Sequence, residues 1–362
     1  MKEKLHPFQV ALLIYMIQSG VTLFSVPRLA AEAFGTNGWI GILPVSLIVC
    51  ILLLLIGLIF KWGKGQSIFT ILGGVVPRWI LIPLYLLIAC NFTILAILVT
   101  KKYILLLKML FFQDTPSLVF ILMFFVLSYL LLSGDIYQIG KATVILFFFT
   151  IWTMLLLTAH LSEFSFVRMT TFFFQGDKDL LKGGLNIFSA FLGFELSLFL
   201  FPYVQNHFTK TLLIGNGITT LIYFSVSFVC FGFFSFDYII QDLYPVITLI
   251  EYVKFPFIER VENLIFSLFA LKVLITVVMY LWAGKELVQN SFPRLKPNFI
   301  VFSLLTFGYL VSNIPKVIRE VDQWLLWFTY IETGIVFILP ILLLFLLAVN
   351  KLRKRNGVNV EA

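Results

Sequence analysis

The stretch "SAFLGFELSLFLFP", Ser189–Pro202, places a single glutamate among apolar and small residues. A carboxylate at the centre of a membrane helix costs about 2.5–3.5 kcal/mol on insertion scales. Glu195 directly follows Gly193 and Phe194, and glycine adopts backbone conformations that interrupt a helix. The sequence therefore predicts that Glu195 lies beside an interrupted turn and faces a polar interior rather than lipid.

The composition is that of a polytopic membrane protein. The 362 residues are 60% hydrophobic and 12% charged, whereas a soluble domain is about 25% charged. Charge-free stretches such as 39–60 and 211–236 exceed the roughly 20 residues that span a bilayer as a helix. We expect an all-α integral membrane protein, one transmembrane domain over residues 1–362, with ten transmembrane helices at about 8–33, 38–60, 79–106, 116–134, 142–160, 183–206, 211–234, 257–288, 298–315 and 328–350.

The residues that carry most metal and redox chemistry are few and scattered. Cys50, Cys90 and Cys230 all lie in apolar spans, with neither a disulfide framework nor a metal-binding spacing. The polar residues assemble no nucleophile–base–orienter set, so we expect no enzyme, no cofactor and no metal. The net charge of +8 comes without a basic face outside the membrane ends, which argues against a nucleic-acid partner and in favour of contact with membrane lipid.

The basic residues predict the orientation of the chain. An even number of spans puts both termini on the same side, and "KLRKR", residues 351–355, directly follows the last span. Basic clusters beside a membrane helix favour the cytoplasmic face. We therefore expect both termini to be cytoplasmic, with residues 351–362 forming a basic tail.

Two of the predicted spans are interrupted at their centres. The first span breaks at residues 18–22, "QSGVT", and the sixth at residues 193–195, "GFE". These spans begin two five-span halves, over about residues 8–160 and 183–350. Paired interrupted helices at corresponding positions are typical of inverted-repeat transporters and point to their binding site. We expect a 5+5 inverted repeat with interrupted helices 1 and 6.

An unwound turn within a membrane is tolerated only where protein buries it or where it lines a polar cavity. There the N-terminus of a half-helix presents N–H groups and a partial positive charge to an anion such as a carboxylate. An alternative stays open, because small residues also allow membrane helices to pack closely. The binding-site reading predicts ligand contacts from the two breaks and the small polar face that precedes the second: Gln18, Ser19, Gly20, Val21, Thr22, Asn186, Ser189, Gly193, Phe194 and Glu195.

Lys272 is a second costly charge, in "FSLFALKVLITVVMY" of the eighth span. Three roles remain open for it. Its ammonium group could tie the unwound part of span one to span eight, where sodium-coupled relatives of such folds hold a cation. It could form an ion pair with a carboxylate such as Glu195, or it could snorkel towards the membrane surface.

Four stretches carry a resemblance to a known family: "LFSVPRLAAEAFGTNGWI", "SAFLGFELSLFLFP", "LYPVITLIEYV" and "PFIERVENLIF". In these stretches the chain resembles the B subunits of spore germinant receptors, the GerAB-like spore germination permeases of the amino acid–polyamine–organocation superfamily. The resemblance runs nearly end to end, and the Glu-Arg-x-Glu element before span eight is its most specific part. It implies a LeuT-like fold in the spore inner membrane and receptor A and C subunits as partners. The implied role is a subunit that binds a small-molecule germinant, such as an amino acid.

The charged cluster Glu259, Arg260 and Glu262 lies at the start of the eighth span. Acidic residues in a first turn complement the helix dipole, so a structural network, including Arg28 or Glu32 from the outer half of span one, is one reading. The other interpretation is that the cluster couples the protein to partner subunits. The same two roles, structural or coupling, are open for Arg28. The sequence thus leaves two functions in competition, a germinant-sensing receptor subunit and a proton- or cation-coupled amino acid transporter.

Overall fold

The computed structural model describes residues 4–355 except 161, 171, 177–179, 205–206 and 254–260. The described residues are helical apart from turns and one isolated bridge between Leu5 and Val204. The helices of the first half are α1 (Pro7–Gln18), η1 (Val21–Ser25), α2 (Val26–Phe34), η2 (Gly38–Gly41), α3 (Ile42–Trp62), α4 (Ile68–Gly73), α5 (Arg78–Leu110), α6 (Ser117–Leu132), α7 (Ile136–Ile151) and η3 (Trp152–His160). Those of the second half are α8 (Leu180–Ala190), η4 (Phe194–Tyr203), α9 (Phe208–Phe233), α10 (Phe236–Gln241), α11 (Pro245–Glu251), α12 (Val261–Ser291), α13 (Pro297–Val311) and α14 (Ile318–Arg355).

The long apolar helices follow the predicted spans. Among the described residues, seven helices are long and apolar enough to cross a membrane, and an eighth such span is the bent pair of Pro7–Gln18 and Val21–Phe34. Two shorter apolar helices, Ser117–Leu132 and Pro297–Val311, occupy the positions of the fourth and ninth predicted spans. The long and the shorter apolar helices expose leucine, isoleucine and phenylalanine side chains on their outer faces, for example Leu47 of α3, Leu122 of α6 and Phe302 of α13. Such exposure suits a lipid environment.

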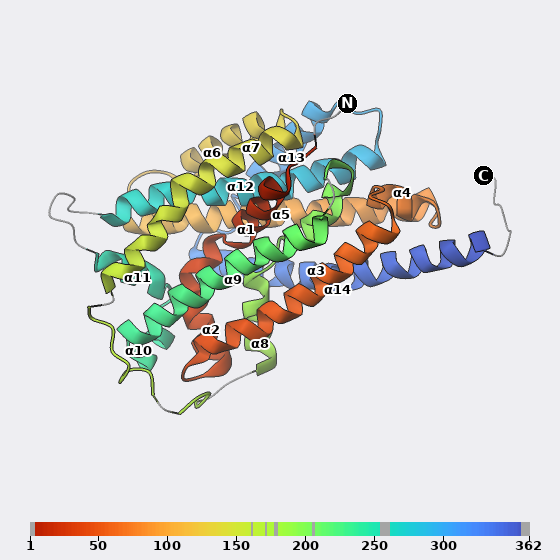
Figure 1. Cartoon of the computed structure of the whole chain (residues 1–362). Coiled ribbons are helices and arrows are strands. Elements are labelled where there is room, and N and C mark those ends of the chain that lie inside the picture. The colour runs from red at the N-terminus through yellow and green to blue at the C-terminus, as the bar shows by residue number, and fades with distance from the viewer. Residues whose placement is uncertain are drawn as a thin grey trace.

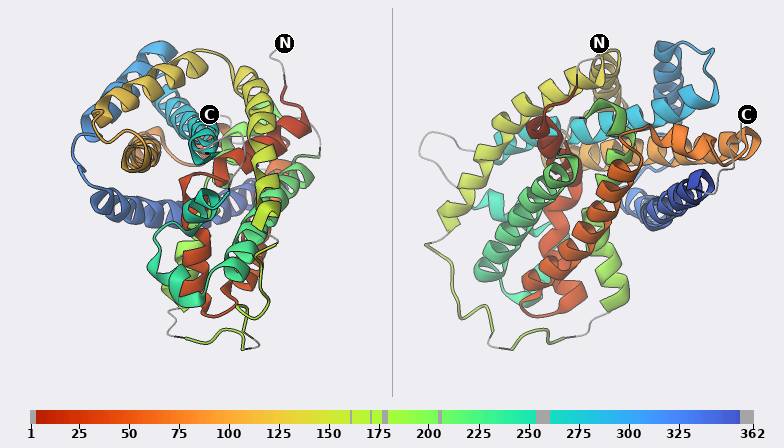
Figure 2. Two further views of the ribbon diagram at one scale, coloured as in Figure 1. Left: turned by 90° about the vertical axis from the view of Figure 1, so that its left-hand side faces the viewer. Right: turned by 45° about the vertical axis from the view of Figure 1, so that its right-hand side comes forward.

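The helices sort into two packed groups. In the first, α1 packs on α9, α9 packs on α3, and α2 packs on α8. In the second, α12 packs along α5, and α6 and α13 pack against both. Figure 1 shows α3 and α9 side by side, inclined to α5 and α12, and Figure 2 shows the same arrangement from two further sides. Each group therefore combines helices from both halves of the chain.

The broken elements lie where the two groups meet. The helix α1 contacts both α9 of the first group and α12 of the second, and η4 contacts α1, α3 and α12. The helix α14 reaches across from α5 to α3, and α7 packs on both α1 and α12. The residues at the two breaks, 18–21 and 191–195, are thus buried in protein, which is the setting that an unwound turn requires.

Candidate functional site

The first break separates α1 from α2 by a short stretch that bends the chain by 53°. The helix α1 ends at Gln18, and Gly20 precedes the single tight turn η1. The Ser19 hydroxyl donates to the Tyr15 carbonyl at 2.6 Å, and the Ser19 N–H group donates to the same carbonyl at 2.9 Å, so Ser19 closes the last turn of α1. Pro27 in the first turn of α2 lacks an N–H donor, which suits a helix start, where that donor would have no intrahelical partner. The break therefore follows from the local sequence.

The second break lies between α8 and η4. The helix α8 ends at Ala190, and Gly193 has a φ of 106°, a backbone conformation that favours glycine. The N–H group of Gly193 donates to Glu195 Oε2 at 2.9 Å, so the glutamate caps its own break. The predicted interruption at Gly193 thus lies where the structure unwinds.

Side chains from α9 and α12 hold the carbonyl groups that the breaks expose. The Tyr223 hydroxyl of α9 lies 2.7 Å from the Gln18 carbonyl and 2.8 Å from the Ala190 carbonyl, so it joins the two breaks. The Thr276 hydroxyl of α12 lies 3.1 Å from the Met16 carbonyl and 3.3 Å from the Ile17 carbonyl. Both breaks are therefore supported by hydroxyl groups rather than left to water alone.

Gln18 connects the breaks to a polar face of α9. Its amide nitrogen donates to the Phe191 carbonyl at 3.0 Å and to Asn216 Oδ1 at 3.1 Å, and its amide oxygen accepts from the Thr219 hydroxyl at 2.7 Å. Asn216 in turn donates to the Ser46 hydroxyl of α3 at 3.1 Å. This network fixes the orientation of Gln18 at the edge of the first break.

A cavity of about 320 Å³ opens between the breaks, α5, α12 and α14. Six of the ten residues predicted to bind a ligand line it: Gln18, Gly20, Val21, Thr22, Asn186 and Ser189. The other four, Ser19, Gly193, Phe194 and Glu195, are buried and do not line it. At the first break, η1 faces the cavity. At the second break, the last turns of α8 face it.

Gly193 lies against the first break instead of the cavity. A Cβ atom on Gly193 would come within 2.3 Å of Ile17 Cγ2. The glycine therefore allows the two breaks to approach each other closely, which realises the packing role that the sequence left open for small residues.

The cavity also has walls that the sequence analysis did not identify. Thr276 and Tyr280 of α12 and Glu332 of α14 line it. Glu332 lies in "YIETGIVF" as a lone carboxylate in an apolar helix. Its insertion into a membrane is as costly as that of Glu195, so the same signal could have identified it. Thr276 and Tyr280 had no such signal, because a threonine and a tyrosine are common in membrane helices.

Glu195 and Glu332 meet although they lie on different elements. Each is 1% exposed, and the two carboxyl groups lie within hydrogen-bonding reach of each other. The Tyr280 hydroxyl donates to Glu332 Oε1 at 2.6 Å. Glu195 therefore lies behind the cavity wall, next to a second buried carboxyl group.

Charged residues surround the mouth of the cavity. Arg28 and Glu32 form an ion pair of 2.7 Å within α2, and Lys102 of α5 pairs with Asp322 of α14 at 2.8 Å. Lys102 also lies 5.6 Å from the centre of the Tyr244 ring. Burial and the nearby Asp322 carboxylate raise the pKa of the Tyr244 hydroxyl, which stays a neutral donor at physiological pH. All five of these residues, Arg28, Glu32, Lys102, Tyr244 and Asp322, line the cavity.

Lys272 lies in the core, two turns of α12 from Tyr280 on the cavity wall. It is 2% exposed, which excludes snorkelling towards the membrane surface. Its ammonium nitrogen is 2.8 Å from the Tyr15 hydroxyl and 4.6 Å from the centre of that ring, and no carboxylate of the described residues pairs with it. Lys272 thus ties α12 to α1 through Tyr15, whereas Thr276 contacts the α1 carbonyls.

The cluster before the eighth span is only partly described. Glu259 and Arg260 lie outside the described residues, and Glu262 stands in the first turn of α12. Arg28 pairs with Glu32 of its own helix. The predicted structural or coupling role of this cluster stays a prediction.

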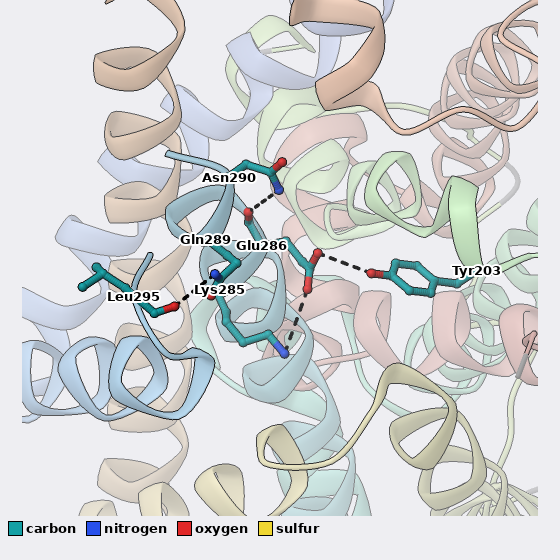
Figure 3. Close-up of polar contacts among 6 residues, drawn as sticks. All are labelled: Tyr203, Lys285, Glu286, Gln289, Asn290 and Leu295. Atoms are coloured by element: carbon teal, nitrogen blue, oxygen red, sulfur yellow. Dashed lines mark hydrogen bonds and ion pairs between the residues drawn. The ribbon is translucent and has the colours of Figure 1, made fainter. Parts of the chain in front are cut away.

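The end of η4 away from the break is fastened to α12 and to the N-terminal segment. The Tyr203 hydroxyl lies 3.5 Å from Glu286 Oε2, and Lys285 Nζ lies 4.0 Å from Glu286 Oε1 (Figure 3). The Leu5 N–H group donates to the Tyr203 carbonyl at 2.8 Å. Gln289 and Asn290 in Figure 3 donate to backbone carbonyls around the end of α12. These contacts join η4 to the second helix group far from the mouth.

No group of three or more histidine, cysteine, aspartate or glutamate residues in the described chain could hold a metal ion. The three cysteines are free thiols. What the arrangement offers a ligand is therefore backbone N–H groups at η1, hydroxyl and amide groups, and the Glu332 carboxyl group.

Solved structures of similar fold are transporters. Mhp1, a nucleobase-cation-symport-1 family transporter, matches with a TM-score of 0.59 at 12% identity, over 90% of this chain and 75% of that one. A sodium-coupled sialic acid symporter matches with a TM-score of 0.58 at 11% identity, over 91% and 74%. At such identity the likeness shows the fold alone, and it confirms the expected all-α, LeuT-like architecture.

The sequence relatives are germination proteins. Spore germination protein GerQB of Bacillus cereus is 26% identical over 357 residues, covering 96% of this chain and 97% of the relative. Spore germination protein B2 of Bacillus subtilis (strain 168) is 25% identical over 370 residues, covering 97% of each. The family model described as spore germination protein, Spore_permease, matches residues 4–321. The resemblance seen in the sequence is confirmed, and this integral membrane protein belongs to the spore germination protein (Spore_permease) family.

Proposed function

We propose that this chain is the permease-like, germinant-sensing subunit of a spore germination receptor. It binds an amino acid or a similar small nutrient in the cavity between the helix breaks and signals to receptor A and C subunits in the spore inner membrane. The observation that carries this proposal is the 320 Å³ cavity lined by both breaks, with Gly20, Val21 and Thr22 on one side and Asn186 and Ser189 on the other.

The chemistry of the cavity suits a small polar ligand. The first N–H groups of η1, at Val21 and Thr22, lie at the start of a helical turn, where N–H groups lack intrahelical partners and attract an anion. Both residues line the cavity. A ligand carboxylate would bind there, and the Ser189 hydroxyl and Asn186 amide would contact its polar groups.

The two helix groups supply a means of signalling. A ligand shifts an equilibrium only by its difference in affinity for two states, and moving a switch from mostly off to mostly on takes about 5.5 kcal/mol. The cavity takes its walls from both groups, α1, η1 and α8 on one side and α5 and α12 on the other. A ligand that contacts both groups therefore favours one relative arrangement, which partner subunits would read.

Thermal unfolding of the purified protein against a panel of L-amino acids, sugars and nucleosides tests the proposal. A ligand at one hundred times its dissociation constant adds about 2.7 kcal/mol to the folded state. Ser189→Trp, which fills the cavity, is expected to abolish the stabilisation by the active compound. Gly217→Trp is the matched control, because nothing lies within 4 Å of a Cβ atom at this exposed position of α9. Stabilisation that survives Ser189→Trp would place the ligand elsewhere.

A proton- or cation-coupled amino acid transporter is the second candidate. The observation in its favour is that solved structures of similar fold are named as transporters. Uptake of the stabilising compound into liposomes that contain this protein alone would favour the transporter. Binding without uptake, together with loss of germination in spores that carry Ser189→Trp, would favour the sensor.

A further inference from the structure

The cavity wall contains a pair of carboxyl groups that the proposed carboxylate site at η1 does not use. Glu332 lines the cavity, and the Glu195 carboxyl group lies behind it, within hydrogen-bonding reach. Glu195 lies at the second break, at the start of η4, whereas Glu332 lies within the continuous helix α14. Both are 1% exposed, so water does little to offset their charge.

The hydrogen bonds of this pair are incomplete unless a proton is present. Glu195 Oε2 accepts from the Gly193 N–H group at 2.9 Å, and Glu332 Oε1 accepts from the Tyr280 hydroxyl at 2.6 Å. The other two oxygens, Glu195 Oε1 and Glu332 Oε2, receive no donor from the described residues. An ionised carboxylate can only accept, so two ionised groups would repel each other without any hydrogen bond between them. One proton on Glu195 Oε1, donated to Glu332 Oε2, satisfies both.

The basic groups of the neighbouring elements are engaged elsewhere. Lys272 of α12 donates to the Tyr15 hydroxyl of α1, and Lys102 of α5 pairs with Asp322 at the cavity mouth. Lys61 of α3 and Lys182 of α8 are exposed at helix ends.

The Tyr280 hydroxyl donates to Glu332 Oε1 as a neutral group, and no printed ion pair of the described residues joins a lysine or arginine to Glu195 or Glu332. Within the described residues, therefore, no protein cation neutralises the pair. A pair with one proton keeps a single negative charge on the cavity wall.

We propose that Glu195 holds the shared proton and that the remaining charge, on Glu332, binds the ammonium group of a primary amine in the cavity. This inference rests on the proposed function for the cavity as the ligand site, and it names the ligand class. An α-amino acid in the cavity would then place its ammonium group at Glu332. The proton stays on Glu195 when the amine binds, so no proton is released.

Infrared spectroscopy of the purified protein at neutral pH tests the shared proton without any ligand. We expect the carbonyl band of a protonated carboxylic acid in the wild type and its loss in Glu195→Gln, whose amide supplies the donor instead. Glu163→Gln, at an exposed surface position, is the control and should keep the band. A wild-type spectrum without the band, or a band that survives Glu195→Gln unchanged, would overturn the assignment.

Thermal unfolding with methylammonium chloride tests the amine site. We expect a saturable rise in melting temperature for the wild type and for Glu195→Gln, which keeps the charge on Glu332. Glu195→Gln/Glu332→Gln should lose this rise. Methanol, the neutral analogue, and sodium chloride at equal ionic strength should give none in the wild type, and this comparison needs no variant. Equal stabilisation by sodium, or by methanol, would exclude an amine site.

The two experiments separate this inference from the proposed function. A panel of nutrients that gives no stabilisation, together with a clear response to methylammonium, contradicts the proposed function and leaves the carboxyl pair standing. A nutrient that binds in the absence of the infrared band contradicts the carboxyl pair and leaves the proposed function standing.

Discussion

Gly193 lies directly against Ile17, so closely that a Cβ atom on the glycine would be 2.3 Å from Ile17 Cγ2. The two helix breaks therefore touch through a position that has no side chain. The cavity lies directly beside this contact, because Ile17 itself and Leu192 line it. The two interruptions therefore lie against each other at the centre of their spans, beside the cavity that we propose as the ligand site.

Gly193→Ala should destabilise the protein strongly. A left-handed φ costs a residue with a side chain about 1–2 kcal/mol, and overpacking a core costs about 1–3 kcal/mol. We expect the free energy of unfolding to fall by about 2–5 kcal/mol, the sum of these two costs. Thermal unfolding in detergent measures it, with Gly217→Ala as the control because its Cβ atom meets open space. Equal melting temperatures for the two variants would show that the breaks do not touch.

Tyr223→Phe should loosen the junction of the two breaks. The hydroxyl group lies within 2.8 Å of carbonyls on both sides, and a buried acceptor left without a donor costs about 1–3 kcal/mol. Hydrogen exchange of the amides near Ala190 should speed up in the variant, while amides in α5 and α13 stay protected. Uniform protection across the chain would contradict the bridging role.

Thr276→Val should destabilise the end of α1 by about 1–3 kcal/mol, because the Met16 and Ile17 carbonyls lose their hydroxyl donor without a change in side-chain volume. Thr276→Ser keeps the hydroxyl and should retain most of the stability. The melting temperatures of the valine and serine variants, each compared with the wild type, show whether the hydroxyl group carries the stabilisation. A valine variant as stable as the wild type would show that the Thr276 hydroxyl does not stabilise the end of α1.

Lys272 and Tyr15 should be energetically coupled. The ammonium nitrogen is 2.8 Å from the hydroxyl, and a hydrogen bond to a charged group contributes about 1.5–3 kcal/mol. Tyr15→Phe should therefore cost that much when Lys272 is present and less than about 1 kcal/mol in Lys272→Met, where no charge is left unpaired. A double-mutant cycle on unfolding free energies measures the difference. Additive effects would show that the contact contributes nothing.

Local sequence determined the membrane spans and the positions of the breaks. An apolar run of some 20 residues crosses a bilayer as a helix whatever surrounds it. Polar and glycine residues inside such a run, at 18–22 and 193–195, interrupt it for reasons of backbone conformation alone. The family, too, was readable from four short stretches, because those motifs lie in contiguous sequence.

Only the tertiary structure decided which polar side chains share a space. Which face of a broken helix meets the cavity depends on the rotation of neighbouring helices, so Ser189 lines it whereas Glu195 does not. The same packing brought Glu332 to Glu195 and Thr276 to the end of α1, across distances in sequence that no periodicity spans. Helix packing also placed the Lys272 ammonium group beside the Tyr15 hydroxyl rather than beside a carboxylate. Hydrophobicity and backbone conformation act locally and can be read along the chain, whereas the partners of a buried polar group are set by how helices pack in three dimensions.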